Sequence, residues 1–141
     1  MTSSTQTSST QETAQPVSPA NRTWYEEFYA GLDAKDSSVV DRLCTPDTTF
    51  RMANHDIDKG RDAVRAGSEH FFTMIGGMRH RFVKVVEQGD SAYLEAIVDY
   101  TRLDGSQVSI PVSTAIDRRD GLIAAQRVYI DLAPLFGAGP L

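Results

Sequence analysis

The chain has 141 residues, of which 40% are hydrophobic and 23% are charged, and its net charge is −5. These values suit one globular domain with its own core, and the lack of a basic run longer than Arg118-Arg119 argues against nucleic-acid binding. No apolar run approaches the roughly 20 residues of a membrane span, and the single cysteine, Cys44, excludes an intramolecular disulfide.

The beginning of the chain differs in composition from the rest. The stretch "MTSSTQTSSTQETAQPVSPAN" holds five Ser, five Thr and three Gln, and Glu12 is its one charged side chain. Such a stretch buries too little apolar surface to offset the entropy lost on ordering, so residues 1–17 are predicted to be a disordered tail. The stretch also lacks the basic start and apolar middle of a signal peptide, which favours a cytoplasmic location. We expect one folded domain over residues 18–136 and a flexible tail over 137–141.

The first half of the domain shows helical spacing of its aromatic and apolar residues. Ser18 and Pro19 favour the start of a helix, and Asp36 is a suitable cap for a second one. The patterns predict a helix over 18–33, a short helix over 37–44, a strand over 48–53 and a helix over 61–76.

The second half changes to a period of two residues, which indicates strands. The short polar segments "QGD", "DG" and "DRRDG" separate them, and Asp104-Gly105 is the strongest hairpin signal. The predicted strands cover 78–87, 91–103, 107–117 and 122–132. Four successive strands of this kind form an antiparallel meander with the helices packed on one face, so the fold class is α+β.

Alternation sorts the residues of two strands into faces. In each strand one face is mixed: Tyr93, Glu95, Ile97, Asp99 and Thr101 in the first, and Ile123, Ala125, Arg127, Tyr129 and Asp131 in the last. Two interpretations remain open. The mixed faces either form the solvent side of a half-buried sheet, with ordinary surface ion pairs, or line a cavity between sheet and helices.

The element order, the "YTRLDG…IP" hairpin and the ending "GLIAAQRVYIDLAPLF" resemble the SnoaL-like branch of the nuclear transport factor 2-like superfamily, over about residues 20–136. Its relatives include polyketide cyclases, ketosteroid isomerase, scytalone dehydratase and limonene epoxide hydrolase. The resemblance implies a cone-shaped α+β barrel, in which three helices pack on a strongly curved antiparallel sheet that encloses a deep apolar pocket. It also implies a homodimer.

The resemblance assigns roles to individual residues. The aspartate of the terminal "R-x-Y-x-D" stretch faces the pocket in the cyclases and epoxide hydrolases and serves as acid or base, which implies the same for Asp131 and places Tyr129 inward. The second aspartate of limonene epoxide hydrolase corresponds to Asp99. The other hydrolytic groups are replaced here, the arginine by Ile97 and the residues that hold the water by Phe50 and Met52.

Two carboxylates that face each other in a pocket cannot both ionise cheaply, so the pair supplies one acid and one base. On this interpretation Asp131 and Asp99 transfer protons, Tyr129 donates a hydrogen bond to a developing oxyanion, and Arg127 lies near Asp99 or at the rim. His80 alternates with Met78 and Phe82 and is the histidine best placed to act as a proton shuttle. The remaining predicted pocket residues are Trp24, Phe50, Met52, Phe71 and Ile97.

The expected function is cofactor-independent isomerase, cyclase or lyase chemistry on a small hydrophobic, oxygenated molecule, such as a polyketide or terpenoid intermediate of secondary metabolism. A non-catalytic module for ligand binding or dimerisation, and an epoxide hydrolase with a modified site, are the alternatives. Neither metal-ligand spacing nor a glycine-rich phosphate loop occurs in the sequence. A homodimer through the outer face of the sheet is expected from a second row of apolar residues, Leu94, Val98, Val128 and Ile130.

Overall fold

A computed structural model describes residues 22–136 of the chain. Its elements follow in the order α1 (Trp24–Asp33), α2 (Ser38–Leu43), β1 (Cys44–Met52), β2 (Asp58–Lys59), α3 (Arg61–Thr73), β3 (Gly77–Gln88), β4 (Ser91–Thr101), β5 (Gln107–Arg119) and β6 (Leu122–Ile130). The predicted α+β class is confirmed. The short strand β2 was not predicted, and β1 begins at Cys44 rather than at residue 48. The predicted tails over 1–17 and 137–141 lie outside the described residues.

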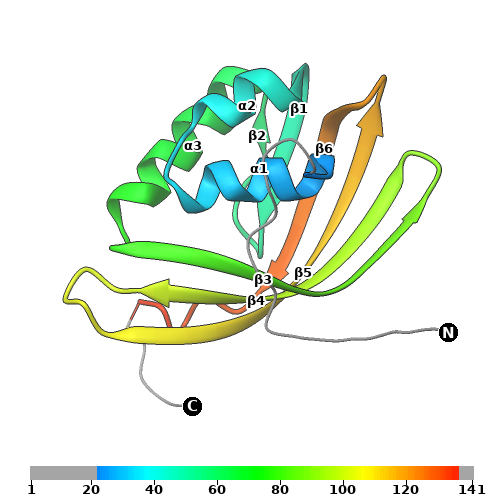
Figure 1. The fold of residues 1–141 in the computed structure, drawn as a ribbon. Coiled ribbons are helices and arrows are strands. Elements are labelled where there is room, and N and C mark those ends of the chain that lie inside the picture. The colour runs from blue at the N-terminus through cyan, green and yellow to red at the C-terminus, as the bar shows by residue number, and fades with distance from the viewer. Residues whose placement is uncertain (1–21, 137–141) are drawn as a thin grey trace, which may run out of the picture.

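The strands form one mostly antiparallel six-stranded sheet in the order β2-β1-β6-β5-β4-β3, with a parallel pair between β1 and β6. The sheet curves strongly, and all three helices lie on its concave side (Figure 1). Register shifts interrupt the pairing at three places: between Cys44 and Thr49, between Phe82 and Lys84, and between Asp117 and Arg118. Because such irregularities bend a strand and increase its twist, they account for the curvature that opens room under the helices.

Helix α1 begins with a capping box. The Thr23 hydroxyl accepts a hydrogen bond from the Glu26 backbone N–H at 3.2 Å, and Glu26 Oε1 accepts one from the Thr23 N–H at 3.0 Å. Two otherwise unsatisfied donors at the helix start are thereby paired. The helix buries Phe28 and Tyr29 against the sheet. None of the helices in residues 22–136 is long and apolar enough to cross a lipid bilayer.

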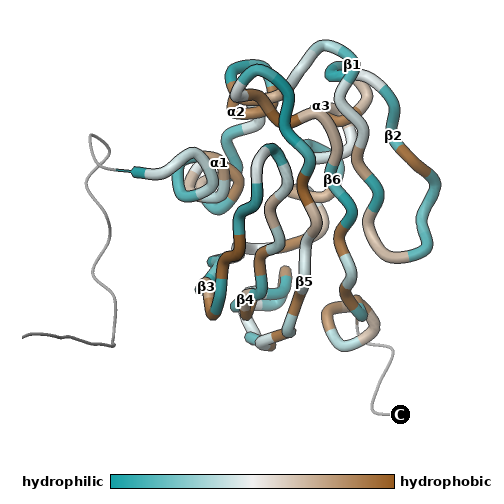
Figure 2. Tube along the Cα trace, turned by 90° about the vertical axis from the view of Figure 1, so that its right-hand side faces the viewer, coloured by the Kyte–Doolittle hydropathy of each residue, from teal (hydrophilic) through white to brown (hydrophobic). Residues whose placement is uncertain are grey.

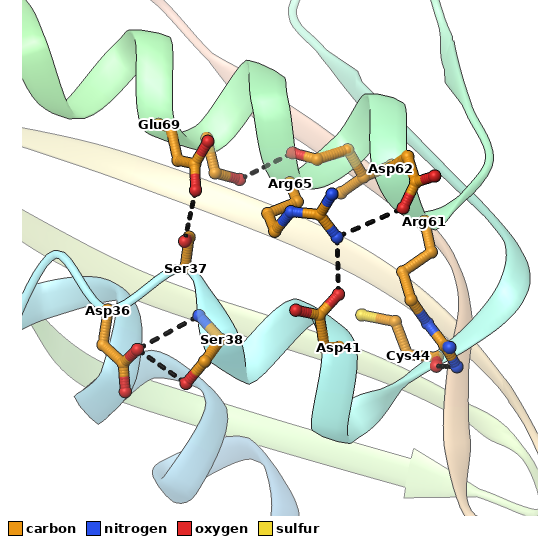
Figure 3. Close-up of polar contacts among 11 residues, drawn as sticks. Asp36, Ser37, Ser38, Asp41, Cys44, Arg61, Asp62, Arg65 and Glu69 are labelled. Atoms are coloured by element: carbon orange, nitrogen blue, oxygen red, sulfur yellow. Dashed lines mark hydrogen bonds and ion pairs between the residues drawn. The ribbon is translucent and has the colours of Figure 1, made fainter.

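A polar layer joins α2 to α3 and the start of β1 (Figure 3). Its contacts connect Ser37 to Glu69 at 2.7 Å, Arg65 to Asp41 at 2.7 Å, and Arg61 to the Cys44 carbonyl at 2.6 Å. The two helices are therefore held as one unit above the sheet.

The sheet has one apolar face, and it is the concave one. On β4, the residues Ala92, Leu94, Ala96, Val98 and Tyr100 are all buried under the helices. The alternate residues of the same strand, from Tyr93 to Thr101, point to the convex side. Figure 2 shows the alternation as brown and teal segments along the strands. One core cluster lies between this apolar face and the helices, and the other is completed by the segment after β6, which contributes Leu132 and Leu135.

Candidate functional site

A cavity of about 480 Å³ lies between the concave face of the sheet and the helices. Its walls come from all three helices, from strands β1 to β6 and from the segment after β6. The lining is mainly aromatic and aliphatic, with a few polar side chains, which is the usual make-up of a small-molecule site. The sequence-based expectation of a deep apolar pocket is therefore met by this chain.

The acid pair predicted for that pocket is not in it. Asp99, Asp131, Tyr129 and Arg127 belong to the mixed faces of β4 and of the β6 end, and these faces point away from the cavity; 61% of the Tyr129 surface is exposed. The prediction was wrong because alternation defines two faces without saying which one the helices cover. The more apolar face, from Ala92 to Tyr100, is the covered one, so the solvent-side interpretation of the mixed face is correct.

Asp99 takes part in a surface network instead of a catalytic pair. Its carboxylate receives two hydrogen bonds from Arg81, at 2.7 and 2.9 Å, and one from the Ser109 hydroxyl at 2.7 Å. The Arg81 hydrogen bonds lower the pKa of Asp99 to about 2, further aided by Ser109 and Arg79. A carboxylate held in this way is a weak base. Arg127 likewise pairs with Asp117 at 2.9 Å on the convex side.

Asp131 caps the turn that follows β6. Its Oδ1 accepts the backbone N–H of Ala133 at 3.0 Å, a local side-chain to backbone bond typical of aspartate at turns. Arg102 then binds the carbonyls of Pro134 and Leu135, at 2.9 and 3.3 Å. These contacts fix the segment from which Leu132 and Phe136 reach the cavity. The carboxylate predicted as catalytic thus shapes the wall of the site from outside.

Among the other predicted site residues, the structure places His80, Phe50, Met52 and Phe71 in the lining of the cavity. It places two elsewhere. Trp24 donates its indole N–H to Glu87 at 3.0 Å and lies under the Arg118 guanidinium, 4.3 Å from ring centroid to Cζ. Ile97 is on the convex face, in register with Pro111.

His80 and Asp33 form the best-defined polar pair of the site. The Nδ1 atom of His80 lies 2.6 Å from Asp33 Oδ1, and the other carboxylate oxygen, Oδ2, accepts the His80 backbone N–H at 2.9 Å. Their side chains are only 12% and 19% exposed. Because an ionised carboxylate accepts but does not donate, this contact assigns the proton of a neutral His80 ring to Nδ1, which leaves the lone pair on Nε2. Because His80 lines the cavity, Nε2 is the ring nitrogen available to a ligand.

Two tyrosines beside this pair are suited to donate hydrogen bonds. The Tyr29 ring lies 4.6 Å from the His80 ring, centroid to centroid. Burial raises the pKa of Tyr29 well above its ordinary value, more than the neighbouring Thr114 lowers it. Burial also raises the pKa of Tyr100 to about 12, with a further contribution from the Asp33 charge. Both phenols therefore stay protonated over the physiological range.

The model of the SnoaL-like domain family matches residues 25–126, most of the chain and nearly the whole described fold. The chain belongs to the SnoaL-like domain family. A search of curated protein sequences gave no match.

Solved structures similar to this SnoaL-like domain share its fold at low identity. A nuclear transport factor 2-like protein of unknown function from Burkholderia pseudomallei is 18% identical, with a TM-score of 0.73 over 80% of this chain and 94% of that one. A protein described as a SnoaL-like polyketide cyclase from Jannaschia is 19% identical, with a TM-score of 0.68 over 90% and 100%. An epoxide hydrolase of the limonene type from M. tuberculosis is 18% identical, with a TM-score of 0.68 over 81% and 84%. These likenesses establish the nuclear transport factor 2-like fold.

Sequence reasoning missed Asp33 in this SnoaL-like domain, although a signal was present. Tyr29 and Asp33 are four residues apart on α1 and so lie on one face of the helix. That face packs towards the strand on which His80 alternates with Met78 and Phe82. A helical carboxylate on an aromatic stripe is a candidate partner for a strand histidine. In the described part of the chain, no group of three or more His, Cys, Asp or Glu is arranged to hold a metal ion.

Proposed function

We propose that this SnoaL-like domain is an enzyme that moves a proton at a carbon next to a carbonyl group in a small, largely apolar molecule. The observation that carries the proposal is the 2.6 Å contact between His80 and Asp33 beside a mainly apolar cavity. A histidine whose tautomer is fixed by a carboxylate is a suitable general base near neutral pH.

In the proposed reaction, His80 Nε2 takes the proton from the carbon. The electron pair of the broken C–H bond moves into the new C=C bond of an enolate, and the carbonyl oxygen gains negative charge. Tyr29 or Tyr100, both kept protonated by burial, donates a hydrogen bond to that oxygen. Asp33 keeps its negative charge and stabilises the imidazolium that forms.

The enolate has three ordinary fates. Return of the proton from His80 to another carbon gives an isomer, attack of the carbanion on a second carbonyl gives a ring, and loss of a group from the next carbon gives an alkene. These are the isomerase, cyclase and lyase outcomes. The description of a fold neighbour as a polyketide cyclase supports oxygenated intermediates of secondary metabolism as the substrate class. The epoxide hydrolase alternative loses the two acids on which it rested, because Asp99 and Asp131 lie outside the cavity.

Solvent deuterium exchange tests the proposal without knowledge of the natural substrate. Phenylacetone is an aromatic ketone with acidic C–H bonds next to its carbonyl, and it is small enough for the cavity. In D₂O, the protein should accelerate loss of these proton signals in the NMR spectrum about tenfold or more over buffer, in a saturable manner. Phenethyl alcohol, which has no such C–H bond, should compete. A protein that binds phenylacetone without faster exchange would be a ligand-binding module, and the proposal would be abandoned.

We also propose a homodimer through the convex face of the sheet. The apolar row predicted to form this interface is not on the convex face, because Leu94 and Val98 are buried inside and Val128 and Ile130 line the cavity. Support comes instead from large side chains on the convex face, with Tyr93 57% and Val86 48% exposed in one cross-strand pair.

Light scattering after size exclusion should give twice the monomer mass at micromolar concentration. Tyr93→Glu should reduce it to the monomer mass, because a charge would be buried at the interface. Leu103→Glu, a similar change at the exposed hairpin between β4 and β5, should not. A monomeric wild-type protein would contradict the proposal.

A further inference from the structure

Asp58, Phe50 and Gln126 form one row across three neighbouring strands. In the pairing of the sheet, Phe50 stands opposite Asp58 of β2 on one side and opposite Gln126 of β6 on the other. Residues in register point to the same face of a sheet, and all three line the cavity. The row lies at the β2 edge of the sheet, whereas His80 is on β3 at the opposite edge. The cavity therefore has polar side chains near both edges of the sheet, and Thr114 and Tyr100 lie on the strands between them.

Gln126 is a polar side chain without a hydrogen-bond partner for its amide in the described chain. It is 3% exposed, and its amide makes no hydrogen bond to any other residue of the range 22–136. A primary amide carries two donors and an acceptor, and the Gln126 amide is not among the side-chain atoms that are sealed in the core without a partner. It lines the cavity, where a ligand can complete its hydrogen bonds.

The Asp58 side chain reaches the cavity because Gly67 of α3, which has no side chain, leaves room for its carboxylate. A methyl group on the Gly67 Cα would lie 2.6 Å from Asp58 Oδ2, which is closer than van der Waals contact allows. Gly67 and Ser68 line the cavity at the same place. Within the described residues, the Asp58 carboxylate makes no ion pair with a Lys or Arg.

The charges around the cavity favour a cation. Its lining contains no Lys or Arg from the described part of the chain, and Asp56 adds a second carboxylate beside Asp58. The basic side chains of the lining are the imidazoles of His55, His70 and His80. Asp58 is half-buried and Asp56 is exposed, so these carboxylates lie where the cavity opens to solvent, and without a Lys or Arg partner they favour a cationic group of the ligand.

We infer that Asp58 and Gln126 bind a protonated amine at the end of the ligand that is remote from His80. The inference rests on the proposed function, because it concerns the ligand of the same cavity. The Asp58 carboxylate and the Gln126 carbonyl oxygen each accept an N–H of the amine. The carbon that reacts then lies at the His80 end, and Asp58 decides which molecules bind in that orientation.

Three size-matched probes test the inference by isothermal titration calorimetry: phenethylamine, phenethyl alcohol and phenylacetate. The wild-type protein should bind the amine most tightly and the carboxylate most weakly. Asp58→Asn should weaken the binding of phenethylamine about tenfold or more, which is the usual effect of losing a charge-assisted hydrogen bond. The affinity for phenethyl alcohol should change less than about threefold. Asp90→Asn makes the same charge change on the β3–β4 hairpin, where the Asp90 carbonyl accepts the Arg118 backbone N–H. This variant should bind all three probes with wild-type affinity.

Gly67→Ala gives a second, independent variant. The new methyl group displaces the Asp58 carboxylate, so phenethylamine should weaken as in Asp58→Asn, while the melting temperature stays level or rises because alanine favours the helix. A purely structural role of Asp58 would lower the melting temperature and affect amine and alcohol alike.

The inference is overturned if phenethylamine does not bind saturably, if the alcohol binds as tightly as the amine, or if Asp90→Asn has the effect of Asp58→Asn. His80→Gln separates it from the proposed function, since this variant should keep the amine preference. Amine binding without deuterium exchange would refute the catalytic proposal and leave the amine site in place. Deuterium exchange without a preference for the amine would refute the amine site and leave the catalytic proposal in place.

Discussion

Asp33→Asn is expected to slow deuterium exchange into phenylacetone by about 100-fold or more while the protein stays folded. The asparagine oxygen can still accept the His80 backbone N–H, but the amide then presents an NH₂ group to Nδ1. The imidazole must accept that hydrogen bond at Nδ1, which puts its proton on Nε2. The nitrogen that faces the cavity then has no lone pair for the substrate.

His80→Gln should show a loss of the same size, and the double variant should be no slower than either single one, because the two residues act as a unit. Asp90→Asn, remote from the cavity, is the matched control and should exchange at the wild-type rate. Rates are followed by NMR, and thermal melts establish the folded fraction. An Asp33→Asn protein that keeps its rate would show that His80 is not oriented by Asp33 for catalysis.

Gly31→Ala is expected to destabilise the fold by roughly 1–3 kcal/mol, the usual range for overpacking a core. A methyl group on the Gly31 Cα would lie 3.0 Å from Val39 Cβ and closer still to Val39 Cγ1. Val39 is fully buried where α2 packs against α1, so it has little room to move. The clash exceeds the gain of up to about 1 kcal/mol that alanine brings to a helix.

The matched variant is Gly67→Ala, which also replaces a helical glycine. There the methyl group meets the end of the flexible Asp58 side chain, so stability should stay level or rise. Urea unfolding of both variants gives the comparison. Equal effects of the two substitutions would mean that the contact between α1 and α2 is looser than the structure indicates.

The order and type of the elements could be read from the sequence because they depend on local periodicity and on hairpin signals such as Asp104-Gly105. The family likewise followed from motifs near the end of the chain. Alternation alone could not show which face of each strand points towards the helices. Comparing hydrophobicity would have placed the row from Ala92 to Tyr100 inside, and with it Asp99 outside. The resemblance to relatives that have a catalytic aspartate at the position of Asp131 indicated the opposite face.

The site itself depends on contacts between residues far apart in the chain. Asp33 and His80 are 47 positions apart, and no local pattern connects them. The placement of Asp58 depends in the same way on Gly67, a glycine that looks unremarkable inside a helix until the neighbouring carboxylate is seen. Phe50, Met52, Phe71 and His80 lie in the cavity lining, as expected, and their roles in binding or catalysis stay predictions.

The strand order has a consequence for how the chain folds during synthesis. Strand β1 leaves the ribosome before β6, its long neighbour in the sheet, and the Thr48 hydroxyl donates to the carbonyl of Ile123, 75 positions later. Until that later segment emerges, β1 and the helices beside it have an open edge and an uncovered apolar side. Closing so large a loop is slow, and the waiting intermediate is prone to aggregation. The nascent first half is therefore the stage at which a chaperone would be most useful to this protein.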